Sequence, residues 1–577
     1  MTLSPFEVVS DNRGYYGANT MSGTRFNTKI EDLASAVTIV TKEQMTDFAM
    51  LDINDVFLYT VGAEGTGTYT DIVVDRNGSV SDNVQLNPTQ ANRVRGLASA
   101  NVAFNNIEMQ NRTPIDPVMI DALEVSRGPN ASVFGLGNPS GTVNQVGASA
   151  NLLRDRYQVQ LRGDDWGGYR ETVDVNQVIL PEKLALRFSQ VFNHEEWERK
   201  PSGVDTERYN VMVKYRPFKN TTITGGYYYY HMYGNRPNAI PPRDGISYWR
   251  DSGAPTWDPV SREITLNGQV LTRPNGSTAW GATNGNYDGP TDALSSGWLG
   301  GTHSQVFINE NGAITHWTGP TGVSGIGTPQ PPNGPNPSGP GVQPNRYLQP
   351  TPMAGLGNAS TGKGAQALFL TVPSITDRSI FDWKNINISA PNRIWDKSEI
   401  STLQLDQIFL NTPRQTLAAQ FTFLREESER YQRNFIGIAN DLGLSGLLTI
   451  DVNERLLDGA NNPYFLRPYI STSKPRTTYS PWKWDTYRGQ AAYKFDFTQE
   501  RNLLRHLGIH QLTGYYEYKY RVNRNYSYRD VMTSNNPWIT PGVYRGNQSQ
   551  VANTPTLIAT TQSNFRYYVG DNQGYNA

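Results

Sequence analysis

Cysteine is absent from this 577-residue chain, so the sequence excludes a disulfide framework, a thiolate metal site and a cysteine nucleophile. No apolar run reaches the roughly 18 residues that a transmembrane helix needs. The formal net charge is only −1, which excludes the broad basic field that draws a protein to nucleic acid. The chain is longer than one ordinary domain of roughly 100 to 200 residues, so we expect at least two units.

No signal peptide is visible at the start of the sequence. Met1, Thr2 and Leu3 lead directly into polar sequence, without the basic and apolar regions of an export signal. We therefore expect Met1 to mark a mature or incomplete N-terminus.

Aromatic residues are abundant, at 11% of the chain with 32 tyrosines. Tyr and Trp favour the two interfaces of a membrane, because each combines an apolar ring with a polar tip. A membrane barrel alternates apolar residues toward lipid with polar residues toward the lumen, so its mean hydropathy stays low. The composition fits such a barrel, and a Tyr-rich secreted all-β binding or adhesion protein is the alternative.

Residues 152–577 show the two-residue periodicity of strands that have one apolar and one polar face. The clearest case is 516–522, where Tyr and Val alternate with charged residues, and the pattern recurs at 157–164, 173–176, 184–189, 209–216, 417–423 and 493–497. Charges on one face and aromatic rings on the other suit a wet lumen and a lipid exterior. We expect these side chains to face outward: Tyr157, Val159, Val173, Val175, Tyr518 and Tyr520.

The connectors between these strands sort into two classes. Every second connector is short, whereas the connectors between them include the very long segments 234–393 and 431–482. Outer-membrane barrels have short periplasmic turns and long extracellular loops, so we place the long segments outside the cell. The Gly/Pro-rich part, 329–344, is expected to be irregular and exposed.

The periodic segments amount to about nine strands, against the 22 of plugged transporter barrels. We therefore expect an incomplete antiparallel transmembrane β-barrel, whose sheet is curved and open. The chain ends at Ala577 inside a segment that we interpret as an extracellular loop.

Residues 31–151 have the pattern of a small α+β domain. An apolar strand at 37–40 is followed by Thr41 and Gln44, which have the spacing of a capping box for a helix that ends near Phe48. Asp52 is a plausible N-cap for a second helix, which Gly62 ends.

A motif in this domain carries a family resemblance. It begins with Glu124, Val125, Ser126, Arg127, Gly128 and Pro129, and continues through Gly135, Gly137 and Gly141 to Val143 and Asn144. It resembles the signature of the plug domain of TonB-dependent receptors, and Val94, Arg95, Gly96 and Leu97 resemble an earlier element of that plug. The pattern departs from the family at 145–148, which replaces an Ile-x-Thr-Lys ending, and at 105–107, which replaces an Asp-Gly pair.

The same motif residues also have readings from their chemistry alone. The four glycines supply backbone angles closed to other residues, and their spacing does not fit a dinucleotide-binding fingerprint. Arg95 and Arg127 are ordinary surface charges in the simplest interpretation. The resemblance implies instead that they pair with glutamates of the barrel wall and hold the plug.

The first 30 residues form an N-terminal extension. It contains an apolar, Pro-interrupted stretch, made of Leu3, Ser4, Pro5, Phe6, Glu7, Val8 and Val9. The stretch lies where the family carries the TonB box, a mobile segment that pairs as an added strand with a periplasmic energy-transducing protein. A disordered terminus without a partner is the alternative.

No enzymatic site is expected. His506 and His510 have i,i+4 spacing, but no Glu stands where a metalloprotease helix needs it. No catalytic motif is present, and we expect no metal site and no cofactor.

The resemblance implies active, TonB-dependent uptake of a scarce, bulky nutrient across the outer membrane of a Gram-negative-type envelope. Its partners would be a TonB-type protein, outer-membrane lipid and an extracellular ligand, with no role for nucleic acid. A ferric siderophore is the commonest cargo in the family, and an oligosaccharide or cobalamin is the alternative. The tryptophans of the long segment are either sugar-stacking or packing residues: Trp249, Trp257, Trp280, Trp298 and Trp317.

Overall fold

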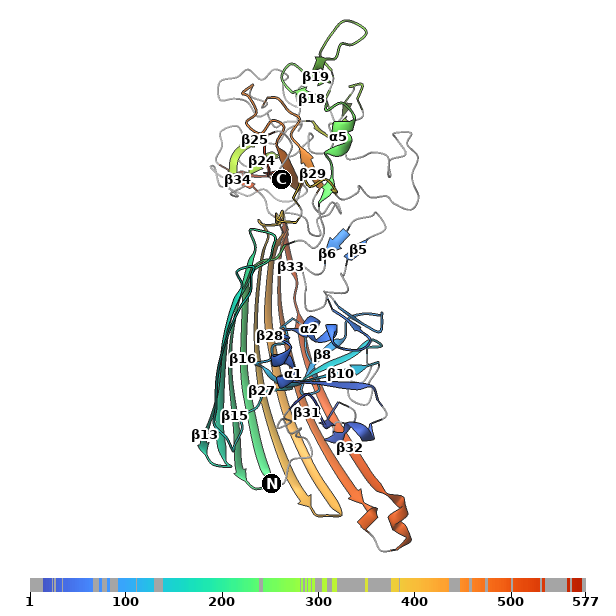
Figure 1. The fold of residues 1–577 in the computed structure, drawn as a ribbon, viewed down its shortest axis with the longest axis vertical. Helices are drawn as coiled ribbons and strands as arrows, with labels where there is room; N and C mark the ends of the chain where they lie inside the picture. The colour runs from blue at the N-terminus through green and yellow to red at the C-terminus, as the bar shows by residue number, and fades with distance from the viewer. Residues whose placement is uncertain are drawn as a thin grey trace.

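The structure is a computed structural model of the chain. It describes residues 14–22, 24, 27–33, 35–65, 72–74, 80–82, 92–110, 112–128, 138–237, 242–280, 282–283, 286–287, 289–291, 293–295, 304–308, 314–318, 348–350, 375–382, 384–434, 447–455, 459–472, 476–499, 502–529, 532–534, 558–560 and 563–572. No helix within these ranges is both long and apolar enough to cross a bilayer. Three units are visible in Figure 1: a small α+β domain, a curved sheet of long strands and a further group of short strands beyond one end of that sheet.

The α+β domain, called the plug below, is built on a mixed sheet of five described strands. Their order is β3 (Val37–Thr41), β10 (Ile120–Arg127), β11 (Gly141–Gly147), β8 (Asn101–Phe104) and β9 (Ile107–Glu108). All neighbours are antiparallel except β11 and β8, which are parallel. Smaller pairs are β1 (Asn19–Thr20) with β2 (Thr28–Lys29), β4 (Ala63–Glu64) with β7 (Arg93–Val94), and β5 (Ile72–Val74) with β6 (Val80–Asp82).

Two short helices cover this sheet and begin where the sequence predicts. Thr41 accepts a hydrogen bond from the Gln44 amide at 3.2 Å and caps α1 (Lys42–Asp47). Asp52 caps α2 (Ile53–Leu58) by accepting from two backbone amides. A 3-10 turn, η1 (Ile30–Asp32), precedes β3. The apolar faces of the helices and strands form one core with Met45, Val56, Phe57, Leu123 and Val125 buried.

The curved sheet, called the wall below, contains ten described strands. Nine follow one another as antiparallel neighbours: β12 (Arg156–Gly163), β13 (Tyr169–Leu180), β14 (Leu184–Glu195), β15 (Gly203–Phe218), β16 (Thr221–Asn235), β27 (Arg393–Asn411), β28 (Gln415–Asn434), β31 (Arg476–Asp496) and β32 (Ile509–Asn523). The tenth, β33 (Tyr526–Arg529), also pairs with β31. Among the described residues, β12 and β32 each pair with one neighbour, so the sheet curves beside the plug without closing.

The two faces of the wall have the phase that the sequence predicts. Tyr157 and Val159 on β12 are 65% and 71% exposed, and Tyr518 and Tyr520 on β32 are 53% and 49% exposed. On β13 the alternate residue Asp174 is buried and contacts the plug. At these positions the apolar side chains therefore point away from the plug, and the alternate polar side chain of Asp174 points toward it.

The connectors lie at two ends of the wall, as their lengths predict. Residues 181–183, 219–220 and 412–414 are the short connectors, and 497–508 carries the 3-10 turns η5 (Phe497–Gln499) and η6 (Leu503–Leu507). The long segments after β16 and β28 extend from the opposite end, beyond which the short strands gather (Figure 1).

The described parts of the long segments fold together into a third unit, called the cap below. Its main sheet has the order β17 (Arg243–Asp244), β29 (Leu447–Ile450), β30 (Pro468–Thr472), β36 (Ser563–Tyr568), β24 (Ser304–Ile308) and β25 (Ile314–Thr318). Around it lie α5 (Ser247–Asp251), β18 (Thr256–Asp258), β19 (Glu263–Leu266), β20 (Gln269–Val270), β21 (Ala282–Thr283), β22 (Asn286–Tyr287), β23 (Leu294–Ser295), β26 (Gln349–Pro350), β34 (Met532–Ser534) and β35 (Ile558–Thr560). Segments far apart in the sequence therefore share one small fold.

The cap has its own apolar core, and three of the tryptophans are packing residues of that core. Trp249, Trp257 and Trp280 are 4%, 0% and 8% exposed and belong to one buried cluster with Ile450 and Ile470. They pack inside the cap and do not present a stacking surface. Trp298, the Trp317 side chain and the segment 329–344 lie outside the described residues.

Candidate functional site: the contact between plug and wall

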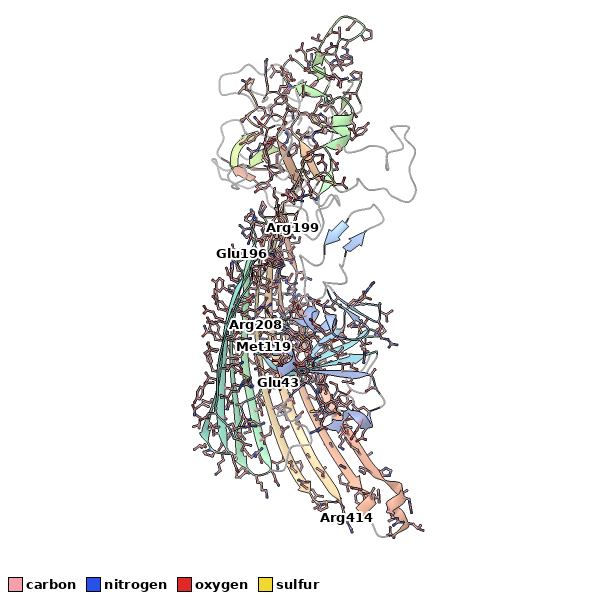
Figure 2. The ribbon with its side chains drawn as sticks, in the orientation of Figure 1. Glu43, Met119, Glu196, Arg199, Arg208 and Arg414 are labelled. Atoms are coloured by element: carbon pink, nitrogen blue, oxygen red, sulfur yellow. The ribbon has the colours of Figure 1, made fainter. Side chains whose placement is uncertain are left out.

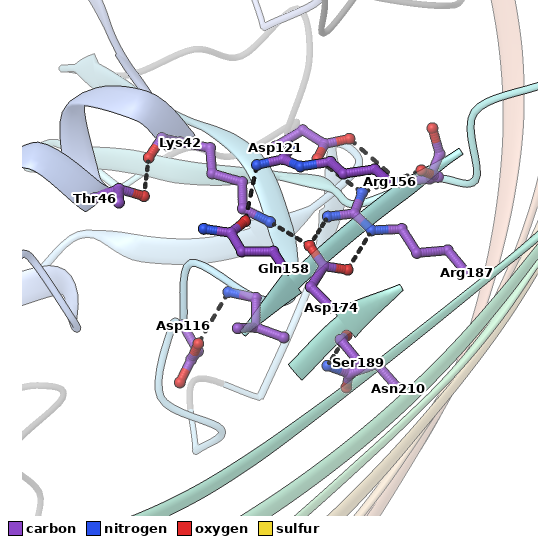
Figure 3. A network of polar contacts seen from close by, with 12 residues as sticks. Lys42, Thr46, Asp116, Asp121, Arg156, Gln158, Asp174, Arg187, Ser189 and Asn210 are labelled. Carbon is purple, nitrogen blue, oxygen red and sulfur yellow. Dashed lines mark hydrogen bonds and ion pairs between the residues drawn. The ribbon is translucent and has the colours of Figure 1, made fainter. Parts of the chain in front are cut away.

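Four charged residues join the plug to β13 and β14 (Figure 3). Lys42, the first residue of α1, donates from Nζ to Asp174 Oδ2 at 3.0 Å. Arg187 grips the same carboxylate from Nε and Nη2 at 2.9 and 2.8 Å, and its Nη1 reaches Asp121 on β10 at 3.1 Å. The wall pair Asp174 and Arg187 thus contacts the plug at both ends, through Lys42 and through Asp121, so the plug cannot move away from the wall here without breaking the network.

This network is largely removed from water. Lys42, Asp174 and Arg187 expose 17%, 4% and 8% of their side chains. Burial, and then the nearby Arg187 charge, lower the pKa of Lys42. Removing one member would leave an unpaired buried charge, which typically destabilises a fold by about 3 to 5 kcal/mol.

A second ionic group lies between the plug and β13 and β15. Arg170 Nη2 donates to Asp116 Oδ1 at 2.9 Å and to Asp116 Oδ2 at 3.0 Å. Arg208 Nε lies 3.3 Å from the same Oδ2. Arg208 also donates to Pro114 O at 2.9 Å and contacts the sulfur of Met119. Figure 2 labels both Arg208 and Met119. Burial raises the pKa of Asp116, but the two arginine charges outweigh it and lower the pKa below its ordinary value.

The plug segment after β9 contacts the outer half of β28 and β31. The Gln110 amide donates to Glu426 Oε2 at 2.8 Å. The Arg112 guanidinium lies 3.4 Å from the centre of the Trp482 ring and donates to Ser480 O at 2.6 Å. Stacking of a guanidinium on an aromatic ring fixes its orientation as well as its charge.

Contacts with β32 complete the ionic surface. Glu108 on β9 accepts from Arg521 at 2.7 Å and from Lys519 at 3.3 Å. Arg488 on β31 donates to the Asn106 backbone oxygen at 2.7 Å. The plug therefore presents mainly carboxylates and backbone oxygens, and the wall presents mainly arginines.

Apolar packing accompanies the charges. The Phe104 ring of β8 meets the Tyr228 ring of β16 edge to face, with centroids 5.3 Å apart. Met212, Ile400 and Leu424 of the wall belong to the same buried cluster as the plug core. Tyr228, a polar-tipped ring on the inner face, also donates to Ala148 O at 3.3 Å.

Two of the cavities between plug and wall border the plug strands β10 and β11. The first, of about 110 Å³, is bounded by Asn144 of the plug and by Thr222, Gln404 and Gln420 of the wall. The second, of about 510 Å³, lies between α1 and the strands β12 and β13. Both are lined mainly by polar groups, and in the described part of the chain no three His, Asp or Glu side chains group closely enough to hold a metal ion.

The predicted arginines lie on the plug surface away from these contacts. Arg127 donates to Val61 O at 2.8 Å and to Thr38 Oγ1 at 3.1 Å, and its Nε has no hydrogen bond among the described residues. Arg95 is exposed, and the structure records no side-chain hydrogen bond or ion pair for it within the described ranges. Among the described residues no contact joins either arginine to a wall glutamate, so the pairing implied by the resemblance has no partner there.

Three of the predicted glycines have positive φ angles. Gly128 has φ +97°, and an added Cβ would lie 2.9 Å from Arg95 Nη1. Gly141 has φ +120°, and a Cβ there would lie 2.1 Å from Ser126 O, inside the β10–β11 pair. Gly96 also has a positive φ, of 69°. These positions require glycine because other residues avoid such backbone angles.

Glu124 is a buried charged residue of the predicted motif, with 1% of its surface exposed. Its Oε2 accepts from Asn144 Nδ2 at 2.8 Å and from Ser22 Oγ. Burial raises the pKa of Glu124, and the Ser22 hydrogen bond opposes that rise. The remaining predicted positions lie outside the described residues: Pro129, Gly135, Gly137, and Leu3, Ser4, Pro5, Phe6, Glu7, Val8 and Val9.

Sequence reasoning missed the residues that join plug and wall. Asp116, Asp121 and Lys42 belong to no recognised motif, and their partners are more than 50 residues away along the chain. One signal was available, since Asp174 and Arg187 occupy polar positions of the alternating strands and therefore had to face the lumen. Alternation predicts the face but not the partner.

Comparison with known proteins identifies the plug. The family described as TonB-dependent Receptor Plug Domain matches residues 29–142. The metal-pseudopaline receptor CntO of Pseudomonas aeruginosa is 27% identical over 164 residues, 28% of this chain and 21% of the relative. The ferrichrome outer membrane transporter/phage receptor of Escherichia coli is 25% identical over 129 residues, 22% of this chain and 16% of the relative.

Among solved structures, the chain is similar to the ferripyoverdine receptor of the outer membrane of Pseudomonas aeruginosa bound to ferripyoverdine. The identity is 13% and the TM-score 0.38, over 91% of this chain and 58% of that one. The matches thus span about a fifth of the two curated relatives and somewhat over half of the solved chain.

Proposed function

We propose that the chain is a TonB-dependent receptor of the outer membrane and that it takes part in energised uptake of a ferric siderophore or a similar metal chelate. In this proposal residues 1–30 form the extension that meets a TonB-type partner, 31–151 form the plug, and 152–577 form part of the barrel with its outer loops. The wall meets lipid with its aromatic face.

The observation that carries the proposal is the kind of contact between plug and wall. Buried ion pairs such as Asp116 with Arg170 position two surfaces, but contribute less net stability than apolar packing of the same size. Polar cavities lie between these pairs. A plug held by charges and bordered by polar cavities suits a device that closes a pore and is moved to open it.

Relatives support the class of cargo. The curated relatives include receptors named for metal-pseudopaline, ferripyoverdine and ferrichrome, all chelates of a metal ion. Buried Trp249, Trp257 and Trp280 remove one argument for an oligosaccharide, because their rings are not available for stacking on sugars. We therefore favour a metal chelate over an oligosaccharide or cobalamin.

Two site assignments complete the proposal. Leu3 to Val9 act as the segment that pairs with the TonB-type partner, because an apolar stretch ahead of the plug suits strand addition. Arg95 and Arg127 act as plug anchors toward carboxylates of the wall, since the buried Arg127 Nε has no hydrogen bond among the described residues.

The test is uptake of radioiron-labelled ferripyoverdine and ferrichrome by a strain that lacks its own receptors and carries this chain. We expect uptake of at least one chelate, and loss of uptake when the energy supply is collapsed. Deleting Leu3–Val9 should abolish uptake while leaving chelate binding to isolated outer membranes unchanged. Uptake that survives this deletion would refute the partner segment, and absence of binding across a wider chelate panel would refute the cargo class.

A further inference from the structure

The end of the wall that carries the short connectors, called the rim below, has an excess of basic side chains. It lies at the opposite end of the sheet from the cap (Figure 1) and consists of residues 181–183, 216–220, 412–414 and 502–508. Within these ranges the carboxylate Glu182 stands against five cations, Lys183, Arg216, Lys219, Arg414 and Arg505. Figure 2 labels Arg414 at this end. The rim is therefore a positively charged edge of the sheet.

Backbone hydrogen bonds hold the parts of the rim in one row. Three such bonds join a connector to its neighbour in the sheet: the Arg216 amide to Lys183 O at 2.7 Å, the Ile408 amide to Asn220 O at 2.9 Å and the Asp496 amide to Arg414 O at 2.8 Å. These bonds continue the ladder of the wall to its end. The basic side chains are therefore carried by ordered backbone, next to the lipid-facing strands.

The rim cations are not balanced in the way that the outer cations are. At the outer end of the wall, the outward-facing lysines of β27 and β31 pair with glutamates of β27 and β28. At the rim, Lys183, Lys219 and Arg505 have no ion pair among the described residues, and Arg505 donates from Nε to His506 at 3.4 Å. An edge with unbalanced positive charge attracts an anionic surface.

Exposed apolar side chains accompany the rim cations. Phe218, the neighbour of Lys219, is 73% exposed, and Phe409 on the outward face of β27 is 63% exposed. The 3-10 turn η6 has no buried residue, and its Leu503 is 84% exposed. Apolar and basic side chains mixed in this way are typical of a segment at a membrane interface. The apolar groups enter the acyl boundary, while long basic side chains reach the headgroups.

We propose that the rim binds anionic phospholipids of the leaflet that faces the periplasm, with Lys183, Lys219 and Arg505 at the lipid phosphates. The occupant is a lipid because the rim continues the lipid-facing surface without a break, through Phe409 on β27. The inference rests on the proposed placement of the wall in the outer membrane, where short connectors face the periplasm.

Binding at the rim fixes the depth of the wall in the bilayer. On the outer side, the charges that begin at Arg425 limit how far the wall can sink. On the inner side, contact between the rim cations and lipid phosphates opposes movement outward. The two ends therefore hold the apolar face level with the hydrocarbon, by different chemistry at each end.

The test measures which lipid surrounds the rim of the full chain in nanodiscs. The chain has no cysteine, so Phe409→Cys gives a single attachment site for a bimane fluorophore beside the connector 219–220. The nanodiscs contain equal amounts of phosphatidylglycerol and phosphatidylcholine, one of which carries a nitroxide quencher near the top of an acyl chain. From the quenching we expect an association constant about fivefold higher for phosphatidylglycerol, the ratio that about 1 kcal/mol from one basic residue supplies.

A second reporter on the same strand controls for general attraction of anionic lipid. Ser401→Cys lies on the same face of β27, about 26 Å further out along the strand, and pairs with Arg425 at the outer end. Both leaflets of a nanodisc have the same lipids, so both reporters meet the same mixture. We expect the two lipids to quench the Ser401→Cys reporter equally, because the charges around it are paired.

Charge variants identify the groups that bind. The preference at the Phe409→Cys reporter should fall to near one in the rim variant Lys183→Gln, Lys219→Gln, Arg505→Gln. The same number of positive charges is removed from the outer end in the control variant Lys397→Gln, Lys483→Gln, Arg425→Gln, which should keep the preference at the rim. High salt should also lower the preference, because it screens exposed charges.

Three results would overturn the inference: equal quenching by the two lipids at Phe409→Cys, the same preference at both reporters, or a preference that survives in the rim variant. The first would leave the rim to an acidic periplasmic protein. If neither lipid quenches the Ser401→Cys reporter, the wall does not lie in lipid and the proposed function fails. Since the measurement needs no chelate, failure of uptake alone leaves the rim inference standing.

Discussion

At the scale of single residues, Asp52 makes the stability of the plug depend on pH. Removal of its carboxylate from water, and then the neighbouring Asp55 charge, raise the pKa of Asp52 to about 6 from 3.8. The folded plug binds this proton more tightly than the unfolded chain does. The contribution of Asp52 to the unfolding free energy is therefore largest below pH 3.8, falls as pH rises toward about 6, and is absent above that range.

Asp52→Asn should remove this dependence while keeping an acceptor for the amides of Asn54 and Asp55. Urea unfolding of the plug between pH 4 and pH 7 should show a decline in the parent, on the order of 2 kcal/mol, that the variant lacks. The exposed Asp32→Asn serves as the control and should retain the decline. The same slope in parent and Asp52→Asn would contradict the assignment.

Asp116 makes the opposite prediction. Asp116→Asn leaves Arg170 and Arg208 buried side by side without a counter-charge, so we expect the plug to lose about 3 to 5 kcal/mol of stability. Hydrogen exchange of β10 amides in the purified chain would measure the loss. Because the pKa of Asp116 is lowered, the stabilisation is present at all pH values above the ordinary carboxyl range and is lost only as pH falls through that lowered pKa. The exposed Asp165→Asn should change neither stability nor its pH dependence.

Residue-level prediction from sequence succeeded where the chemistry is local. Thr41 and Asp52 cap helices because their partners lie two or three positions further along the chain. Asp116 and Arg187 escaped notice because their partners come from other strands, and no periodicity specifies which carboxylate meets which arginine. Glu124 was found through the family motif, but its contact with Ser22 was not.

At the scale of elements, the long wall strands reveal where lipid begins. On the outward face of β28, Phe421 and Phe423 are followed by Arg425, which is paired with Asp485 at 2.8 Å. Lys483 with Glu427 and Lys397 with Glu399 continue the ion pairs further outward. From Gln415 to Arg425 the strand rises about 33 Å, which at a usual tilt spans about 25 Å, the height of a lipid-facing band. The outer halves of β27, β28 and β31 therefore stand above the hydrocarbon.

Phe421→Arg tests this boundary. Phe421 is 44% exposed on the lipid face, so an arginine there should destabilise folding into vesicles by about 2 to 4 kcal/mol. Tyr431→Arg makes a similar aromatic-to-arginine change on the same face of the same strand, about 33 Å further out, and should cost at most about 1 kcal/mol. Equal costs for the two variants would place the band elsewhere.

Strands were more predictable than their pairing. Two-residue alternation located the wall strands and their faces, because lipid and lumen impose opposite demands on neighbouring positions. In the plug, β8 was not recognised, since Asn101–Phe104 is short and buried on both faces and therefore does not alternate. Its parallel pairing with β11 joins segments about 40 residues apart, which local pattern does not encode.

At the scale of the whole molecule, the cap is a separate cooperative unit on top of the wall. Trp257 is fully buried in its core, so Trp257→Ala should destabilise the cap by about 3 to 5 kcal/mol. Limited proteolysis should then cut the segments 242–280 and 447–472 rapidly while the wall strands stay intact. Val260→Ala, at a more exposed position three residues on, should leave the cleavage pattern of the parent. Loss of the wall together with the cap would show that the two are one unit.

The order of strands in the cap has a consequence in time. The strand β36, Ser563–Tyr568, lies between β30 and β24, and its buried Arg566 pairs with Asp451 at 3.0 Å. The ten described wall strands precede β36 in the chain, so a ribosome finishes them before it makes this central strand. Until β36 is made, the sheet of the cap lacks the strand that joins β30 to β24. The cap sheet is thus completed late in biogenesis. A folded cap indicates that all the described wall strands have already been synthesised and exported.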